Sequence, residues 1–269
     1  FAVAAFRLLP AMRGILSGWT QIQNVSTCLD TIEDGLKDDV PEDTASENDK
    51  PIAFKKDLSI ENLTYAYPDS GNVLDNFNCC IRKGEYVGFR GSSGVGKSTL
   101  FNLLIGLLKP SSGNICIDGI PLSVENRRSW LHHIGYVPQE VFIFNGTLAE
   151  NIALGCKEID RDRIKKILNK VSLDKWAESL TNDLDTVLGE AGGKLSGGQK
   201  QRIGIARALY KEADVLFLDE ATSALDNQTE KEVNETVSQL KEFDQGLTIL
   251  SIAHRESSLA YCDRIITLE

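Results

Sequence analysis

One segment constrains the fold of this chain more than any other, the sequence FRGSSGVGKSTLFNLLIGLL at residues 89–108. It holds the spacing GxxxxGKS starting at Gly91, with the apolar run Tyr86 to Phe89 directly before it and a longer apolar run after it. A glycine-rich turn between a strand and a helix aims backbone N–H groups at one point, which the positive end of the helix dipole also faces. The pattern therefore predicts a phosphate-binding loop within an α/β domain.

The side chains of this loop match the chemistry of a bound nucleoside triphosphate. Lys97 is expected to reach the β- and γ-phosphates, and the Ser98 hydroxyl is expected to bind Mg²⁺. Gly94 and Gly96 let the backbone approach the phosphate oxygens closely. The predicted nucleotide-binding residues of the loop are Gly91, Ser92, Ser93, Gly94, Val95, Gly96, Lys97, Ser98 and Thr99.

A second motif, VLFLDEATSALD at residues 215–226, runs from four apolar residues into Asp219 and Glu220. Two carboxylates at the end of a buried strand are costly unless they face a cation or take part in chemistry. We expect Asp219 to hold Mg²⁺ through water and Glu220 to polarise the water that attacks the γ-phosphate. The alternative is a pair of surface carboxylates that only end the strand.

The composition is that of an ordinary globular protein, with 42% hydrophobic and 25% charged residues, which excludes collagen-like and wholly disordered chains. The net charge of −10 is concentrated in residues 30–50, where nine acids stand against two lysines, as in a solvated linker. The mildly acidic remainder argues against a dedicated nucleic-acid partner. Without a CxxC pair, six cysteines are interpreted as reduced structural thiols: Cys28, Cys79, Cys80, Cys116, Cys156 and Cys262.

The opening segment FAVAAFRLLPAMRGIL is apolar, but Arg7, Pro10 and Arg13 interrupt it well before the ~20 residues that span a bilayer. Residues 1–29 therefore fit two alternatives. They form the cytoplasmic end of a membrane helix whose earlier part is missing, or an amphipathic arm that packs on a partner or on the domain. In either case we expect a fragment of a longer protein.

From residue 51 onward, short apolar runs alternate with helical periods, as in an α/β domain. Apolar residues recur at helical spacing within 164–171 and within 233–240. Residues 145–210 contain no convincing strand, so we expect a helical subdomain inserted into the sheet core. The predicted strands are Leu58 to Tyr67, Tyr86 to Phe89, Ile115 to Ile117, Ile134 to Val137, Val215 to Leu218, Thr248 to Ile252 and Arg264 to Leu268.

Just before the acidic strand lies LSGGQKQRIGIARALY, residues 195–210, whose first five residues resemble the signature of ATP-binding cassette (ABC) proteins. The resemblance extends over essentially all of residues 57–269. It implies an α/β fold with a P-loop NTPase core of mixed or parallel sheet and helices, an antiparallel β subdomain and an inserted α-helical subdomain. The expected organisation is an arm or membrane-domain end at 1–29, an acidic linker at 30–50 and a nucleotide-binding domain at 51–269, with the helical subdomain at about 145–210.

The resemblance implies roles for residues outside the two motifs. Tyr67 resembles the aromatic residue that stacks on adenine. Gln139 resembles the glutamine that joins the Mg²⁺ site to the helical subdomain, and His254 resembles the switch histidine that contacts the γ-phosphate. The implied catalytic residues are therefore Glu220, His254 and Gln139, and the implied ligands of Mg²⁺ are Ser98, Gln139 and Asp219.

In the family, two cassettes clamp two ATP molecules head to tail, and the signature of each serves the ATP of the other. A signature at a helix N-terminus favours an anion, which fits this role. Residues 223–226 resemble the loop that crosses the dimer interface. Because all motifs are intact, two equivalent sites and a homodimer are expected. The signature residues expected at the nucleotide are Ser196, Gly197, Gly198 and Gln199.

A cassette by itself does not settle what is transported. The stretch TVLGEAGGKLSGGQ resembles the exporter pattern, in which Gly189, Glu190 and Gly192 match a Gly-Glu-x-Gly sequence that touches the membrane domain. We expect a half-transporter exporter at the cytoplasmic face of the cell (inner) membrane, joined to a transmembrane domain of the same full-length chain and moving a lipid or lipid-linked oligosaccharide. The alternative is an ABC-type ATPase acting as a soluble regulatory, importer or DNA-repair subunit, and a six-helix hydropathy profile upstream would favour the exporter.

Overall fold

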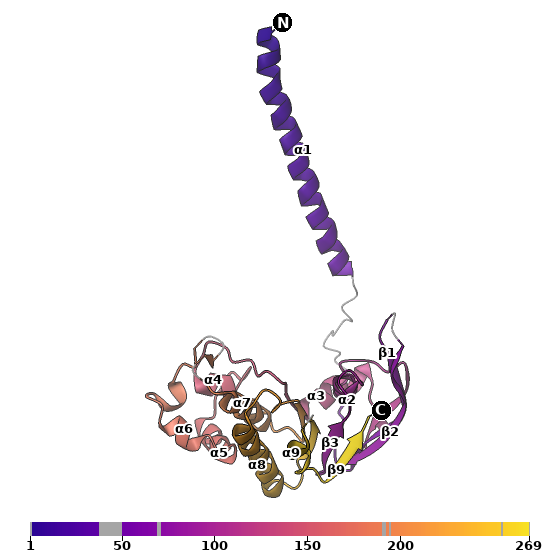
Figure 1. The fold of residues 1–269 in the computed structure, drawn as a ribbon, viewed down its shortest axis with the longest axis vertical. Helices are drawn as coiled ribbons and strands as arrows, with labels where there is room; N and C mark the ends of the chain where they lie inside the picture. Colours follow the sequence, from indigo (N-terminus) through magenta and orange to yellow (C-terminus); the bar gives the residue numbers. More distant parts are fainter. Residues whose placement is uncertain are drawn as a thin grey trace. The chain divides into compact units, whose positions relative to one another are not determined.

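The computed structural model describes residues 2–37, 50–68, 71–189, 192–193, 195–253 and 255–268. The chain divides into two compact units, Phe1–Glu47 and Asn48–Glu269. In the described part of the first unit the helix α1 spans Ala2–Lys37 (Figure 1). It includes the beginning of the range expected to be an acidic linker, and residues 38–49 of that range lie outside the described residues.

Large apolar side chains on α1 are exposed along its length. They recur mostly at intervals of three or four residues, so they share one broad face of the helix. In the ranges that the structure describes, no helix is both long enough and apolar enough to cross a membrane. The exposed apolar side chains are Leu8, Met12, Ile15, Leu16, Trp19, Ile22, Val25, Leu29 and Ile32.

The second unit is built on a five-stranded parallel sheet with the strand order β6-β7-β8-β3-β9. Every residue of β8 is buried, and in β3 and β7 only the last residue is not. Such continuous apolar strands are typical of a sheet covered on both faces. The strands are β3 (Tyr86–Arg90), β6 (Ile134–Val137), β7 (Val215–Asp219), β8 (Thr248–Ile252) and β9 (Arg264–Thr267).

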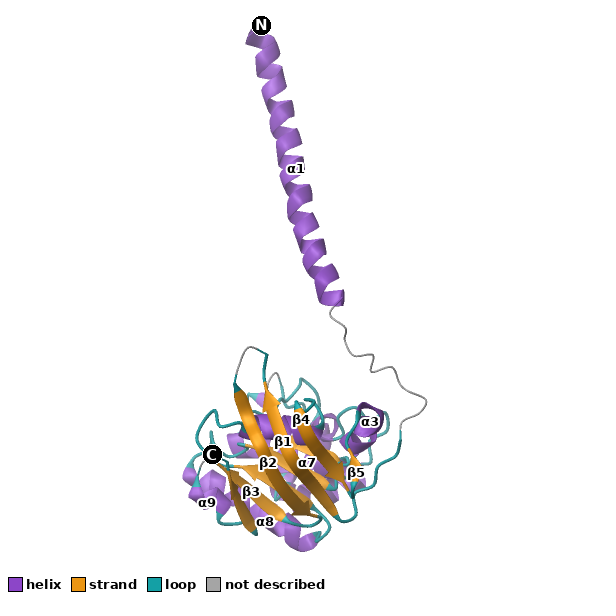
Figure 2. Ribbon diagram, turned by 90° about the vertical axis from the view of Figure 1, so that its right-hand side faces the viewer, coloured by secondary structure: helices purple, strands orange, loops and turns teal. Residues whose placement is uncertain are grey.

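An antiparallel sheet with the order β2-β1-β4-β5 forms the predicted β subdomain (Figure 2). Its last hairpin turns at Asp118 and Gly119, where φ is 50° and 80°, so an Asp-Gly pair supplies the two left-handed positions of a tight turn. The strands are β1 (Asp57–Ala66), β2 (Asn72–Arg82), β4 (Ser112–Ile117) and β5 (Ile120–Pro121).

The region predicted as a helical insertion is helical. In Figure 1 its helices α4, α5 and α6 lie at the end of the unit opposite β1 and β2. Helix α5 begins at an Asp160 cap, whose carboxylate accepts the Arg163 N–H at 2.9 Å. The helices of this region are α4 (Leu148–Ile152), α5 (Arg161–Lys170), α6 (Asp174–Glu178), the 3₁₀ helix Asp183–Asp185 and α7 (Gly197–Tyr210).

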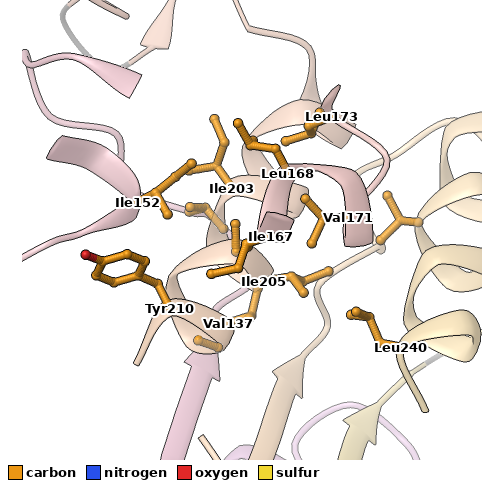
Figure 3. Packing of buried hydrophobic residues seen from close by; sticks show 14 of the residues in the cluster. Val137, Ile152, Ile167, Leu168, Val171, Leu173, Ile203, Ile205, Tyr210 and Leu240 are labelled. Atoms are coloured by element: carbon orange, nitrogen blue, oxygen red, sulfur yellow. The ribbon is translucent and has the colours of Figure 1, made fainter. Parts of the chain in front are cut away.

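A hydrophobic core joins the helical region to the parallel sheet. Figure 3 shows Ile167 and Leu168 of α5 gathered with Ile203 and Ile205 of α7, close to Val137 at the end of β6. All of these side chains are buried. Since a fully buried side chain of this size contributes about 1.5–3 kcal/mol, this cluster fixes α7 against the sheet.

The remaining helices pack around the parallel sheet. Phe101 of α2 stacks edge-to-face on Phe89 of β3 and Phe217 of β7, with ring centroids 5.7 and 5.0 Å apart. The start of α2 is thereby fixed next to the carboxyl ends of both strands. These helices are α2 (Lys97–Ile105), α3 (Val124–His132), α8 (Asn227–Phe243) and α9 (Glu256–Leu259).

Candidate nucleotide-binding site

The carboxyl ends of the parallel strands bring four segments of the sequence to one edge of the sheet. The glycine-rich loop follows β3, Gln139 lies just beyond β6, and Glu220 follows β7. The segment after β8 leads to His254, which lies outside the described residues. In open α/β sheets, ligands bind outside this edge. The fold therefore assembles most of the residues predicted from separate motifs.

The loop between β3 and α2 has the backbone that its glycines predict. Gly94 and Gly96 have φ of 83° and 101°, in the left-handed region. A Cβ at Gly96 would lie 2.8 Å from a methyl group of Val73 and 3.1 Å from its carbonyl oxygen, so no larger residue fits there. Helix α2 begins at Lys97, and its N-cap Gly96 has no side chain that could cap the N–H groups of the first turn.

Lys97 lies inside this loop. It is only 5% exposed, and its Nζ donates hydrogen bonds to the carbonyl oxygens of Gly91 at 3.0 Å and Ser92 at 2.8 Å. These bonds hold the ammonium group within the turn. A cation inside a turn at a helix N-terminus gives the loop the electrostatics of an anion site.

The two oxygens of Asp219 face different partners. Ser98 Oγ donates to Asp219 Oδ1 at 3.3 Å, and the Tyr136 hydroxyl donates to Asp219 Oδ2 at 2.8 Å. Burial, followed by the hydrogen bond to Asp219 and its negative charge, raises the pKa of Tyr136, so its phenol remains a proton donor at neutral pH. The hydroxyl of Ser98 and the carboxylate of Asp219 are hard oxygen donors, which suit Mg²⁺.

Glu220 adopts a backbone conformation that is rare for its residue type. Its φ is 50°, in the left-handed region. Its N–H donates to the carbonyl of Ile252 at 3.2 Å, and its own carbonyl accepts the N–H of Ser223 at 3.0 Å. The neighbouring strand β8 and the turn after β7 thus hold Glu220 at the end of the sheet in a strained conformation of the kind found at functional sites.

Gln139 connects the helical region to the turn after Glu220. Its side-chain Nε2 donates to Ser223 Oγ at 3.0 Å, and its backbone oxygen accepts the side chain of Gln201, on α7, at 2.7 Å. Of the three predicted Mg²⁺ ligands, the structure joins Ser98 to Asp219 and joins Gln139 to Ser223. Gln201 is a contact that the motifs did not predict.

Tyr67 lies beside the first turn of α2. Its hydroxyl is 3.3 Å from Thr99 Oγ1, and its ring stacks edge-to-face on Tyr65 with centroids 5.0 Å apart. The residue is 41% exposed, so part of its ring is accessible next to the phosphate-binding loop. This position fits the predicted stacking partner of a base.

The signature residues begin helix α7. The Ser196 hydroxyl accepts the N–H of Gln199 at 3.2 Å, and the Gln199 side chain accepts the N–H of Ser196 at 2.9 Å, which is a capping box. The two glycines allow close packing on the next part of the chain. A Cβ at Gly197 would lie 2.6 Å from Leu225, and one at Gly198 would lie 2.4 Å from Thr229.

The stretch before the signature is described only in part. Gly189 and Gly192 have φ of 79° and 58°, values that favour glycine. Glu190, which the sequence placed in the same exporter-like pattern, lies outside the described residues.

The parallel sheet, the loop and the acidic strand end define a P-loop nucleoside triphosphatase. Residues 74–223 match the ABC transporter family. The ATP-dependent lipid A-core flippase of Ralstonia nicotianae is 43% identical over 217 residues, which are 79% of this chain and 36% of that protein. ABC transporter B family member 6 of Dictyostelium discoideum is 34% identical over 275 residues, covering 96% of this chain and 39% of that protein.

The solved structure of a bacterial Atm1-family ABC exporter with ATP bound is also similar to this chain. It matches with a TM-score of 0.74 at 33% identity, over 83% of this chain and 39% of that one. The chain thus spans about two fifths of the length of these relatives. The chain belongs to the ABC transporter family, and its second unit is an ATP-binding, ATP-hydrolysing domain of that family.

Proposed function

We propose that this chain is the motor part of an ABC exporter, in which two copies close head to tail on two Mg·ATP and drive transport of a lipid. The observation that carries the proposal is the meeting of the loop after β3 with Asp219 and Glu220 at one edge of the sheet. Phosphoryl transfer needs charges placed around the phosphates and a group that orients the attacking water. The loop and Asp219 provide the first, and Glu220 provides the second.

Each residue at this edge takes one part in the proposed reaction. Lys97 and the N–H groups of the loop bind the phosphates, and Tyr67 stacks on the base. Ser98 and Asp219, with Gln139, would hold Mg²⁺, which neutralises charge on the β- and γ-phosphate oxygens. Glu220 accepts a proton from the attacking water as the γ-phosphate is transferred.

The signature supports a site shared between two protomers. Ser196 caps α7, so its hydroxyl and the following N–H groups lie at a positive helix end, which favours an anion such as a γ-phosphate. We propose that the signature binds the ATP held by the loop of a second copy. Since one chain carries both halves of the site, two identical chains form two equivalent sites, as in a two-fold homodimer.

The first unit supports a connection to a membrane. The apolar side chains exposed on α1 need a partner, and the relatives extend well beyond the part that this chain matches. We propose that α1 is the cytoplasmic end of the last helix of a transmembrane domain in the same full-length protein. The cassette then lies at the cytoplasmic face of the membrane. A lipid substrate is proposed because several relatives are lipid A-core flippases.

The Glu220→Gln variant tests the proposed function. We expect turnover of Mg·ATP to fall by about 10²–10⁴, the usual loss for a general base, while nucleotide binding persists. Because ATP then survives in the site, the variant is expected to form an ATP-dependent dimer, measured by sedimentation velocity with Mg·ATP and with ADP. The matched control is Glu242→Gln, an exposed acid near the end of α8. Turnover near that of the wild type in Glu220→Gln would assign the base elsewhere.

A further inference from the structure

One face of the signature helix α7 binds the segment that carries Gln139. The side-chain Nε2 of Gln201 donates to the backbone oxygen of Gln139 at 2.7 Å. On the next turn of the helix, a Cβ at Gly204 would lie 2.8 Å from a methyl group of Val141, so the helix backbone lies against this segment. Residues three apart share a helix face, so α7 fixes the segment after β6 with one face.

The side chain of Gln201 is buried but only partly hydrogen-bonded. The residue is 5% exposed, and its Oε1 has no hydrogen-bond partner among the residues that the structure describes. A buried acceptor without a partner destabilises a fold, and an apolar side chain of similar shape would not carry that cost. Stability therefore does not explain the amide of Gln201, whose hydrogen bond holds the backbone of Gln139.

The segment that Gln201 holds is connected to the turn of Glu220. The side-chain Nε2 of Gln139 donates to Ser223 Oγ at 3.0 Å, and the Ser223 N–H donates to the Glu220 carbonyl at 3.0 Å. Gln139 is thus held at both ends, by Gln201 at its backbone oxygen and by Ser223 at its amide. A shift of the Gln139 backbone would move this amide away from the turn of Glu220.

We propose that Gln201 is a positioning residue for ATP hydrolysis, which holds the backbone of Gln139 so that the Gln139 amide lies at the turn of Glu220. The inference rests on the proposed function, because it assigns Gln201 no chemistry apart from that of Gln139 and Glu220. The effect falls on the rate of hydrolysis, since the loop after β3 binds the phosphates independently. Because Ser196 caps the same helix, α7 serves the ATP of the partner with its N-terminus and the ATP of its own chain through Gln201.

The test begins with Gln201→Met on the full chain. Methionine has a similar length and a good helix propensity, but it cannot donate to Gln139. We expect kcat for ATP to fall about tenfold, because a small displacement of a positioned group is enough for such a loss. The dissociation constant for ADP, measured without Mg²⁺, should stay within about twofold of that of the wild type, because Gln139 takes no part in that binding. The melting temperature should change little, since the unpaired acceptor is removed together with the hydrogen bond.

A second variant and a matched control separate positioning from folding. Gln201→Leu also lacks the donor, so it should lower kcat in the same direction and leave ADP affinity unchanged. Gln239→Met is the control, because it makes the same substitution at an exposed position of α8. It should keep the kcat of the wild type.

A double-mutant cycle with Gln139→Ala identifies the residue through which Gln201 acts. Alanine keeps the backbone oxygen that Gln201 binds and removes the amide that Gln201 positions. If Gln201 acts through Gln139, adding Gln201→Met to Gln139→Ala should lower the single-turnover rate no further. If Gln201 acts instead through the signature at the start of α7, Gln201→Met should lower the rate by the same factor in both backgrounds.

The possible outcomes distinguish this inference from the proposed function. The same rate loss with and without the Gln139 side chain would overturn the inference alone. So would the kcat of the wild type in Gln201→Met, or a fall in kcat that is matched by losses of ADP affinity and melting temperature. Full turnover in Gln139→Ala alone would contradict the proposed role of Gln139 and the inference together, whereas the role of Glu220 is tested separately by Glu220→Gln.

Discussion

The Tyr136 hydroxyl donates a hydrogen bond to Asp219 Oδ2 at 2.8 Å, between the ends of the neighbouring parallel strands β6 and β7. The other oxygen of Asp219 accepts the Ser98 hydroxyl at 3.3 Å. The carboxylate is therefore oriented from both sides, by the first turn of α2 and by β6. Partners of this kind orient metal-binding carboxylates and tune how tightly they hold the ion.

Tyr136→Phe removes this orientation and leaves the ring. We expect the Mg²⁺ concentration that gives half-maximal ATPase activity to rise about tenfold. Losing a residue that hydrogen-bonds to a metal ligand typically lowers metal affinity or activity by about 10–100-fold. ATPase titrations with Mg²⁺ measure the change. Tyr210→Phe is the control, since its hydroxyl accepts the Asp160 N–H at 3.0 Å in the helical region. An unchanged Mg²⁺ requirement in Tyr136→Phe would mean that Ser98 alone orients Asp219.

Lys97→Ala should weaken ATP binding itself. The ammonium group lies within the loop and faces phosphates that are present before any bond breaks, so its loss affects the ground state. We expect the dissociation constant for ATP to rise about tenfold to a hundredfold, the range for one or two charge-assisted hydrogen bonds. Calorimetry measures it, with Lys109→Ala, an exposed lysine past the other end of α2, as the control. Unchanged ATP affinity in Lys97→Ala would refute this role.

The β subdomain should lose stability in acid through Asp118. Burial acts to raise its pKa, but the N–H groups of Asp57, Lys56 and Lys55 donate to the carboxylate and lower the pKa below its ordinary value. A carboxyl with a lowered pKa stabilises the fold fully above its unfolded pKa of about 4, and this contribution is lost as the pH falls below that value.

Asp118→Asn tests this stabilisation, and asparagine tolerates the left-handed turn conformation. The free energy of unfolding in urea should be about 1–2 kcal/mol lower than in the wild type at pH 7, for the loss of charged hydrogen-bond acceptors. The difference should stay constant down to about pH 4 and narrow as the pH falls below about 4, towards the lowered pKa of Asp118 in the folded state. A difference that stays constant below about pH 4 would show that the charge of Asp118 contributes nothing.

The sequence predicted the strands that carry the site better than those of the β subdomain. The strands β6 and β8 have the predicted limits, because continuous apolar runs identify buried parallel strands. Strand β2 was not predicted, since its sequence NVLDNFNCCIR mixes polar and apolar residues, and its pairing with β1 is irregular after Ile60. Such irregular register removes the simple alternation that marks a strand.

The sequence predicted those residues of the site that lie within local motifs. Lys97, Ser98 and Asp219 could be assigned because their spacing and flanking elements define their positions. Tyr136 could not, because no motif marks it and its partner Asp219 lies far away in sequence.

In the proposed dimer, each ATP lies between the loop of one copy and the signature of the other. A homodimer that carries only Lys97→Ala has both sites damaged, and so does a homodimer that carries only Ser196→Ala. In a mixed dimer of the two single variants, a shared site collects both lesions and leaves the second site whole. In a mixed dimer of wild type with the double variant Lys97→Ala, Ser196→Ala, each shared site carries one lesion.

ATPase assays on the two purified mixed dimers, isolated with two different affinity tags, distinguish a shared site from a site that is complete within one chain. We expect the dimer of the two single variants to hydrolyse ATP faster than the dimer of wild type with the double variant. The reverse order would contradict it, because a site complete within one chain leaves the wild-type copy fully active.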